Sequence, residues 1–266
     1  MIHTFTSDEK GGGVALLNNE LFVLRDRADN QIDVYSTINF TLLRQHHVSI
    51  DNLVNVCDMT ACRQKRCVYL LNGNESGVHR LALDGTECKW PLNADTPLCL
   101  SVTQTSEVLV LCSFITEDKT EVNKLLFLNS ENGECVRMIT AQVRVDVRPY
   151  QCVELKEDRY LLTYHDGDEV DDPGGIGLLD GEGKLLQSTE DEVVMHHPGY
   201  LAVDSDQFVF VCNIGASSVD LFDPMLGFVC NLTEGIALRP RSFVLDEFTR
   251  RLYIDEYFHK VSVVQL

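Results

Sequence analysis

The stretch PGYLAVDSDQFVFVCNIGASSVDLFDPMLGFVCNL, residues 198–232, contains four short apolar runs separated by turn residues. The runs are GYLAVD, QFVFVCN, SVDLFD and FVCNL. Runs of this length, rich in Val, Leu and Phe and bounded by Asp, Asn, Ser and Gly, are typical of β-strands joined by tight turns. We therefore predict a four-stranded antiparallel sheet. Such a sheet has two unpaired edges and cannot bury a core alone, so it needs further copies.

The rest of the chain supplies these copies. Residues 239–266 repeat the first three strands about 42 residues later, a spacing typical of propeller blades, which are roughly 40–50 residues long. Similar strand pairs occur earlier in the chain, at residues 149–164, 97–112, 52–72 and 13–25. The sequence therefore predicts an all-β fold, a six-bladed β-propeller of four-stranded antiparallel blades that forms one domain over residues 1–266.

The two ends of the chain suggest how the ring closes. The last unit contains only three strands and ends at Leu266. Ile2, Thr4 and Phe5 lie in an extended, alternating segment at the other end. We expect residues 2–6 to pair with residues 261–266 as the outermost strand of the last blade, which would protect both edges.

Charge limits the classes of partner. The 266-residue chain has 41 acidic and 22 basic residues and a formal net charge of −19, so nucleic acid would be repelled over most approaches and a basic partner is favoured. No stretch approaches the roughly 18 consecutive apolar residues of a membrane helix, and the first residues lack the pattern of a signal peptide. We expect a cytoplasmic monomer that does not enter a membrane.

The cysteines fit the same interpretation. Six of the ten fall inside predicted strands, where a free thiol behaves as a small apolar group. Cys62 and Cys67 bracket a basic loop, but no C-x-x-C pair exists, which disfavours a zinc or redox motif. We expect no cofactor.

An acidic loop in the fourth unit is the main candidate for a charged site. Its carboxylates are Asp166, Asp168, Glu169, Asp171 and Asp172. An EF-hand would require a ligand at position five of the loop, which is Val170, and a glutamate at position twelve, which is absent. We favour a solvated acidic loop over a metal site, and the loop stays a candidate contact with a basic partner.

The repeated V-D turn at residues 203–204, the F-V-x-V second strand at 208–211 and the V-x-L-F third strand at 219–222 resemble NHL-repeat propellers. The resemblance extends over nearly the whole chain and includes the NHL-like propellers of invertebrate proteins, some of which accompany tripartite-motif modules. It implies a six-bladed propeller. The family often places an arginine after the second strand, whereas residues 213–218 here read NIGASS. RNA-binding members have a strongly basic face, which this acidic chain lacks.

Alignment of the repeats gives a candidate ring at one mouth of the channel. The aligned positions are Val54, Cys99, Gln151, Tyr200 and Ser242. This ring offers an amide, a phenol, a hydroxyl and a thiol, but no carboxylate and no imidazole, and a hard cation prefers anionic oxygen ligands. A hydrolase or lyase with a channel metal, like the lactonase-like propellers, is therefore disfavoured, although a shift of the alignment by one residue would change the ring.

The sequence leaves two alternative functions. The first is a non-catalytic scaffold that recognises a protein or peptide through loops on a propeller face, with residues 115–123, 165–175 and 239–259 as candidate contact regions. The second is the propeller hydrolase or lyase. We favour the scaffold.

Overall fold

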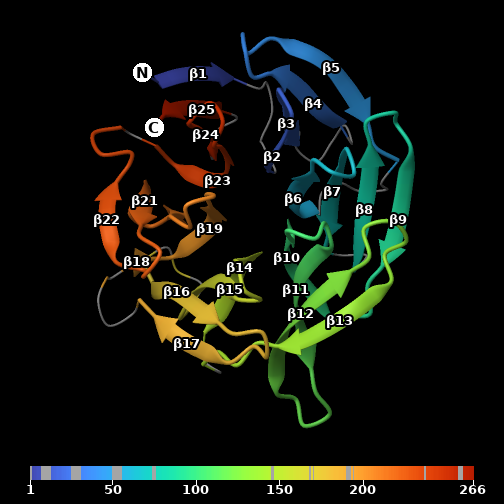
Figure 1. Ribbon diagram of the computed structural model, residues 1–266, viewed down its shortest axis with the longest axis vertical. Helices are drawn as coiled ribbons and strands as arrows, with labels where there is room; N and C mark the ends of the chain where they lie inside the picture. Colours follow the sequence, from blue (N-terminus) through green and yellow to red (C-terminus); the bar gives the residue numbers. More distant parts are fainter. Residues whose placement is uncertain are drawn as a thin grey trace.

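The computed structural model describes residues 2–6, 13–24, 31–49, 56–73, 76–144, 147–167, 169, 171–189, 193, 195–236, 238–256 and 260–266. Throughout these residues the regular structure is β-strand, arranged as six antiparallel sheets around one central axis (Figure 1). No helix in the described part of the chain is long and apolar enough to cross a membrane.

The first three blades follow one another along the chain. Blade 1 consists of β2 (Val14–Leu17), β3 (Glu20–Leu24), β4 (Gln31–Ser36) and β5 (Leu42–His47). Blade 2 consists of β6 (Val56–Cys62), β7 (Cys67–Asn72), β8 (Gly77–Ala82) and β9 (Glu87–Pro91). Blade 3 consists of β10 (Thr96–Val102), β11 (Val108–Ile115), β12 (Glu121–Leu128) and β13 (Cys135–Thr140).

The remaining blades continue the ring. Blade 4 consists of β14 (Arg148–Glu154), β15 (Tyr160–His165), β16 (Pro173–Leu179) and β17 (Leu185–Ser188), and β18 (Met195–His196) pairs with β16. Blade 5 consists of β19 (Pro198–Val203), β20 (Val209–Asn213), β21 (Ser218–Phe222) and β22 (Phe228–Asn231). Blade 6 consists of β23 (Pro240–Asp246), β24 (Arg251–Glu256), β25 (Lys260–Gln265) and β1 (Ile2–Thr6).

Strand exchange closes the ring as predicted. β1 pairs with β25 in an antiparallel register that joins Ile2 to Val264 and Thr6 to Lys260. The N-terminal strand thus becomes the outermost strand of blade 6, and the two ends of the chain lie next to each other (Figure 1). The six-bladed, four-stranded architecture predicted from the repeats is confirmed.

The core lies between the blades rather than within one central cluster. Six apolar clusters occupy the described part of the ring, and each joins two neighbouring blades. In the cluster between blades 2 and 3, Trp90 is 5% exposed and packs 5.6 Å from the Tyr69 ring. A Cβ on Gly133 of blade 3 would lie only 2.1 Å from Trp90, so the indole needs a glycine there. Burial between blades explains why a single blade is not stable alone.

The alignment of blade 2 differs from the predicted one. The sequence analysis aligned Val54 of the unit 52–72 with the channel-ring positions, whereas the first strand of this blade, β6, spans Val56–Cys62. Blades 3 to 6 each have a proline near the start of the first strand, which fixes the alignment of the repeat: Pro97, Pro149, Pro198 and Pro240. Blade 2 has no such proline, so its alignment was wrong by four residues.

Candidate functional site

Strand register identifies the true member of the channel ring in blade 2. In blade 2 the register shifts between Val56 and Asp58, after which Asp58 pairs with Leu71. The same shift precedes the pairing of Cys99 with Leu111 and of Gln151 with Thr163. Asp58 therefore occupies the position that the sequence analysis gave to Val54, which lies outside the described residues. The inference that the ring contains no carboxylate is corrected by this finding.

The other predicted ring residues have different surroundings. Gln151 and Tyr200 line a cavity in the central channel, whereas Cys99 and Ser242 are each 2% exposed and do not line it. Burial raises the pKa of the Cys99 thiol well above its usual value, so the thiol stays protonated. The structure thus brings two of the four described ring residues into one space.

Asp58 connects four blades across the channel. One of its carboxyl oxygens accepts a hydrogen bond from Met59 N (2.7 Å), and the other accepts one from Leu100 N of blade 3 (2.8 Å). The side chains of Gln151 in blade 4 and Tyr200 in blade 5 also hydrogen-bond to it. Blades 2 and 5 are opposite each other in a ring of six, so this bond crosses the axis. We call Asp58 with these four donors the Asp58 brace.

The ionisation of the brace reflects two opposing effects. Asp58 is 1% exposed, and burial raises its pKa from 3.8, while the four hydrogen bonds lower it, which leaves a pKa of about 7. Burial and the neighbouring Asp58 raise the pKa of the Tyr200 phenol well above its usual value. Tyr200 therefore remains a neutral donor at physiological pH.

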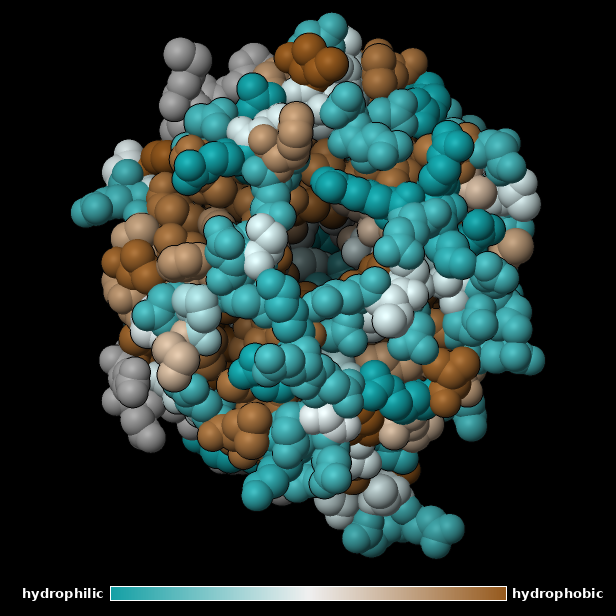
Figure 2. All heavy atoms as spheres, viewed as in Figure 1, coloured by the Kyte–Doolittle hydropathy of each residue, from teal (hydrophilic) through white to brown (hydrophobic). Residues whose placement is uncertain are grey.

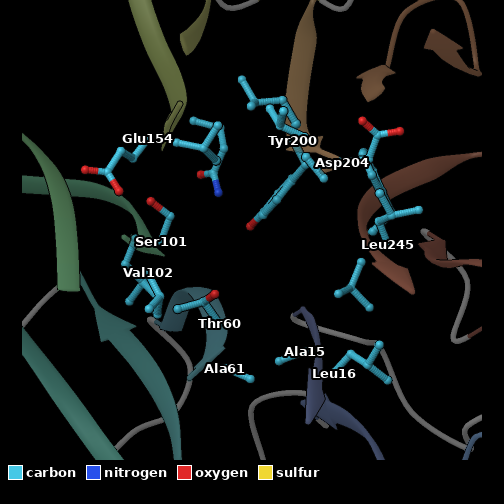
Figure 3. Close-up of a pocket in the computed structure, with 18 of the residues that line it drawn as sticks. Ala15, Leu16, Thr60, Ala61, Ser101, Val102, Glu154, Tyr200, Asp204 and Leu245 are labelled. Carbon is cyan, nitrogen blue, oxygen red and sulfur yellow. The ribbon is translucent and has the colours of Figure 1, made fainter. Parts of the chain in front are cut away.

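The brace forms the floor of a cavity of about 520 Å³. This volume falls within the range of roughly 300–1,000 Å³ that small-molecule sites occupy. Apolar side chains of the innermost strands, among them Ala15, Ala61 and Leu245, share its walls with polar ones such as Thr60 and Ser101, and the Tyr200 ring extends into its middle (Figure 3). A space-filling view shows a hollow at the centre of the disc surrounded by mainly hydrophilic residues (Figure 2).

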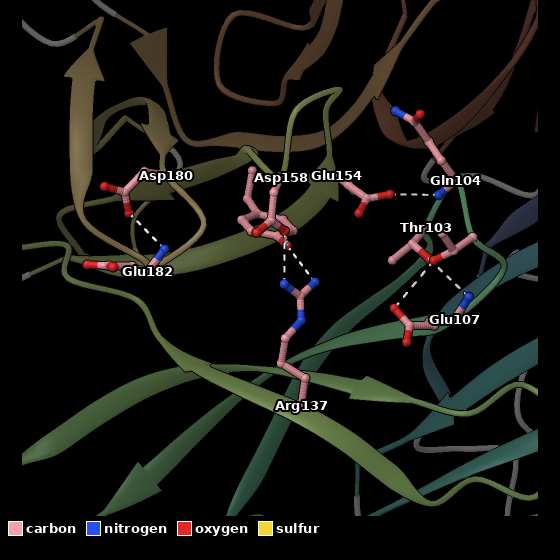
Figure 4. Close-up of polar contacts among 10 residues, drawn as sticks. Thr103, Gln104, Glu107, Arg137, Glu154, Asp158, Asp180 and Glu182 are labelled. Carbon is pink, nitrogen blue, oxygen red and sulfur yellow. Dashed lines mark hydrogen bonds and ion pairs between the residues drawn. The ribbon is translucent and has the colours of Figure 1, made fainter.

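The cavity opens on the face that carries the turns between the first and second strands of each blade. Its rim contains residues from these turns: Arg63, Gln104, Lys156, Asp204, Ser205, Gln207 and Glu247. Carboxylates there are hydrogen-bonded to backbone N–H groups, as when Glu154 accepts from Gln104 N of the neighbouring blade (2.7 Å, Figure 4). The candidate contact regions 115–123 and 165–175 contain the connections between second and third strands, at 115–121 and 165–173, so they lie on the opposite face.

The rim is an unfavourable place for isolated negative charge. Burial, opposed by a hydrogen bond from Phe208 N and reinforced by the nearby Glu247, raises the pKa of Asp204. Burial also raises the pKa of Glu154, although Gln104 N and Arg137 lower it. A bound cation would therefore stabilise both carboxylates in their ionised form.

Two buried polar atoms in the cavity wall have no hydrogen-bond partner in the described structure. They are the side-chain oxygen Oε1 of Gln151, which is 5% exposed, and the hydroxyl oxygen of Ser101, which is 7% exposed. Both residues line the cavity. Buried polar groups are nearly always paired, so these two atoms point to a ligand or to ordered water.

A second buried acid lies in blade 6, paired in register with the ring residue Ser242 of β23. Asp255 on β24 is 1% exposed, and burial raises its pKa to about 7, with Arg241 lowering it and Glu256 raising it. The two carboxyl oxygens of Asp255 have no hydrogen-bond partner of normal geometry among the described residues, and neither does the hydroxyl of Ser242.

The acidic loop is held by histidines. His196 Nδ1 donates to Asp171 O (3.2 Å) and His197 Nδ1 donates to Glu169 O (3.2 Å). His165 bonds to the carbonyl of Gly167, and its ring stacks on His197 with centroids 4.0 Å apart.

The carboxylates of this loop also have partners of their own. Arg144 forms an ion pair with Asp166 (2.8 Å), and Asp172 accepts a hydrogen bond from Glu169 N (2.6 Å). Asp168 lies outside the described residues. The described part of the chain contains no group of three or more His, Cys, Asp or Glu side chains arranged to hold a metal ion.

The sequence contained a signal for Asp58 that the repeat alignment did not use. In four blades the ring residue lies four positions before the residue at which the first turn begins, as with Tyr200 and Asp204. Counting back four positions from Cys62, next to the basic turn, gives Asp58. The sequence had no comparable signal for Ser101 and Asp255, because side chains of neighbouring blades determine whether their oxygens find hydrogen-bond partners.

Comparisons with known proteins support the fold. Virginiamycin B lyase from Staphylococcus aureus superposes with a TM-score of 0.70 at 11% identity, covering 100% of this chain and 99% of that one. A streptogramin B lyase gives 0.68 at 9% identity, covering 100% and 97%. The WD40 propeller domain of Doa1 gives 0.64 at 12% identity, covering 95% and 78%. No protein-family model matches the chain, and no curated protein is similar in sequence. At such low identities these similarities establish the propeller and not its activity.

Proposed function

We propose that the protein is a non-catalytic interaction module that binds a basic segment of a partner protein at the open end of the central cavity. The observation that carries this proposal is the cavity itself, which is open at one face, closed by the Asp58 brace and lined in part by apolar side chains. The net charge of −19 and the rim carboxylates favour a basic partner.

The dimensions suit an extended peptide. Asp58 lies on β6, and Arg63 follows the last residue of this strand. Both line the cavity, and they are five positions apart. A strand rises about 3.3 Å per residue, so the cavity is on the order of 15 Å deep. An extended segment of four or five residues has about this length. A rigid ring loses little conformational entropy when such a segment binds.

The test is a selection of peptides from a random displayed library against the purified protein. We expect enrichment of Lys- or Arg-containing sequences that bind the wild-type protein and fail to bind Ala61→Trp, in which an indole fills the cavity. The matched control is Ala216→Trp, which places the same side chain on an exposed turn between β20 and β21.

A third variant separates the two faces. Replacing Asp166, Asp171 and Asp172 by Asn removes three of the five carboxylates of the acidic loop on the opposite face. We expect the selected peptides to bind this variant normally. Loss of binding here, with normal binding to Ala61→Trp, would move the site to the loop face. An absence of basic residues among the selected peptides would refute a basic partner.

A lyase or hydrolase is the second candidate, because a carboxyl group with a pKa of about 7 lies beside a phenol at the cavity floor. Groups with such a pKa can transfer protons at neutral pH. Neighbours by fold include virginiamycin B lyase from S. aureus and a streptogramin B lyase, and one solved structure of the S. aureus enzyme is a catalytically inactive variant with quinupristin. Incubation with quinupristin followed by liquid chromatography and tandem mass spectrometry tests this alternative, because chromatography separates an elimination product that has the same mass as the substrate. We expect no product, and turnover that Tyr200→Phe abolishes would favour the enzyme.

The proposal also includes the finer identity of the repeats. We infer that the blades are NHL-like and that the protein acts as a cytoplasmic monomer, on the basis of the repeat motifs at residues 203–222 and the closed ring. Sedimentation of the purified protein tests the monomer: a single species of about 30.0 kDa is expected.

A further inference from the structure

We propose that the floor of the cavity is a binding site for a primary ammonium group, formed by Gln151, Ser101 and Tyr200 with the Asp58 carboxylate behind them. This inference rests on the proposed function, because it names the chemical group of the partner that reaches the floor. The groups available there are mainly acceptors, and an ammonium group is a cation with three donors and no acceptor.

Free acceptors are the first argument. Gln151 Oε1 and Ser101 Oγ are buried in the cavity wall without partners in the described structure. The Tyr200 hydroxyl donates to Asp58, so its oxygen can still accept a hydrogen bond. Because the Ser101 hydroxyl has no partner among the described residues, turning it toward the cavity breaks no hydrogen bond there. Unpaired buried acceptors are unfavourable, and a donor ligand would remove that cost.

Charge is the second argument. Asp58 lies directly behind Tyr200 and Gln151, and a cation at the floor would favour its ionised form. The other titratable groups that face Asp58 are the thiol of Cys99 and the phenol of Tyr200, both of which burial keeps neutral. Arg241 also acts on Tyr200, from blade 6. The Asp58 carboxyl group is therefore a group at the floor that can carry a negative charge opposite a bound cation.

Geometry distinguishes ammonium from guanidinium. An arginine binds best to two free oxygens of one carboxylate, in a planar, two-bonded arrangement. Both Asp58 oxygens already accept backbone hydrogen bonds, from Met59 N and Leu100 N. Separate acceptors on three strands suit the three N–H bonds of an ammonium, while the apolar part of the walls suits the aliphatic part of a lysine side chain.

The experiment measures calorimetric binding of a blocked peptide, acetyl-Gly-Gly-Lys-Gly-Gly-amide, at pH 7.5. Companion peptides carry Nε-acetyl-lysine, norleucine or arginine in place of lysine, and an unblocked pentaglycine presents only an α-amine. We expect the lysine peptide to bind at least ten times more tightly than the acetyl-lysine and norleucine peptides, and more tightly than the arginine peptide. Comparison with pentaglycine distinguishes a side chain from a chain terminus as the source of the ammonium.

Variants assign the binding to the floor. Gln151→Leu and Ser101→Ala each remove one acceptor. Each should reduce the affinity for the lysine peptide about five-fold or more, without changing the affinity for the norleucine peptide. Gln142→Leu is the matched control, because Gln142 is exposed outside the cavity. Equal binding of lysine and acetyl-lysine peptides, or equal effects of Gln151→Leu and Gln142→Leu, would overturn the ammonium site.

Failure of the two proposals can be told apart. If peptides bind in the cavity but the floor substitutions do not change their affinity, the proposal of an interaction module is supported and the ammonium site is refuted. If no peptide binds, n-butylamine is added and the tyrosine NMR signals are followed. A shift of the Tyr200 signal that Ser101→Ala reduces would support the floor site and refute the peptide module, whereas no shift would refute both.

Discussion

Asp58 and Asp255 are the same residue type, each is 1% exposed, and burial brings the pKa of each to about 7. Their surroundings are nevertheless opposite. Asp58 accepts hydrogen bonds from its own strand and from three other blades. Asp255 has no hydrogen-bond partner of normal geometry among the described residues, and Arg241 is the main group that favours its charge.

The difference shows that a similar pKa does not imply a similar role. At Asp58, four donors organise the carboxyl group, so its removal would leave several buried N–H and O–H groups unpaired. At Asp255, the carboxyl group is itself the unpaired group, so a neutral side chain of the same shape removes the free-energy cost of burying an unpaired charge. Buried donors without partners are expensive, while deleting an unpaired charge is favourable.

Replacing Asp58 by Ala should produce the largest effect. Four donors lose their acceptor and blades 2 to 5 lose their link across the axis, so we expect a loss of about 4 kcal/mol in the free energy of unfolding. Urea denaturation followed by circular dichroism measures this. Asp206→Ala, at an exposed turn position, should change it by less than about 0.5 kcal/mol. Equal effects of the two substitutions would show that the brace does not stabilise the ring.

Removing residues 2–6 tests the blade that contains Asp255. β25, which β1 covers, also pairs Val261 with Asp255, so deletion leaves an open edge one strand away from this acid. We expect a loss of roughly 3 kcal/mol in unfolding free energy, from several ladder hydrogen bonds at about 1 kcal/mol each. Water should also reach Asp255 more easily and reduce the pH dependence that it causes. An unchanged melting curve would argue against strand exchange as a source of stability.

The sequence predicted the fold because each blade repeats a local pattern. Alternating apolar runs, turn residues and the missing fourth strand in the last unit are all visible along the chain, and they yielded both the six blades and the closure by residues 2–6. Trp90 was likewise predictable as a residue packed between blades, since a large ring in an outer strand must find a neighbour.

The candidate site was only partly predictable. Gln151 and Tyr200 were found because a proline two residues earlier fixes the repeat in their blades, whereas Asp58 was missed because blade 2 lacks that proline. The cavity, the unpaired oxygen of Ser101 and the isolation of Asp255 depend on which side chains from different blades meet near the axis. A one-residue error in any blade changes that set, so a pattern of strands cannot specify it.

Asp255→Asn should change the stability of the protein in a pH-dependent way and stabilise it at pH 8. The folded-state pKa is raised from 3.8 to about 7, so the stability that this group contributes is fully present below pH 4 and is lost as the pH rises toward 7. A three-unit shift corresponds to roughly 4 kcal/mol, so the wild type should lose about 4 kcal/mol relative to the variant between pH 4 and pH 8. With a pH-independent cost of about 2 kcal/mol for the buried amide, the variant should be less stable than the wild type by about 2 kcal/mol near pH 4 and more stable by about 2 kcal/mol at pH 8.

The control for this prediction is another buried aspartate that has donors. Asp33 accepts hydrogen bonds from Gln31 (2.9 Å), Gln45 (3.1 Å) and Tyr35 (3.3 Å), so Asp33→Asn should destabilise the protein. Chemical denaturation at pH 4, 6 and 8 measures both variants. A loss of stability in Asp255→Asn at pH 8 would mean that the carboxylate has a partner that matters.

Tyr200→Phe should have the smallest effect on stability, but it should change the pKa of Asp58 without changing that of Asp255. The phenyl ring keeps the shape that closes the channel, so the loss is limited to one hydrogen bond, about 1 kcal/mol. With one donor fewer, burial opposes ionisation of Asp58 more strongly, and its pKa should rise above about 7 while that of Asp255 changes little. Carboxyl-carbon NMR titration measures both groups, and Tyr35→Phe is the control because Tyr35 donates to Asp33 instead. An unchanged Asp58 titration would mean that the bond across the axis does not form in solution, in which case the floor of the cavity would be held by three blades rather than four.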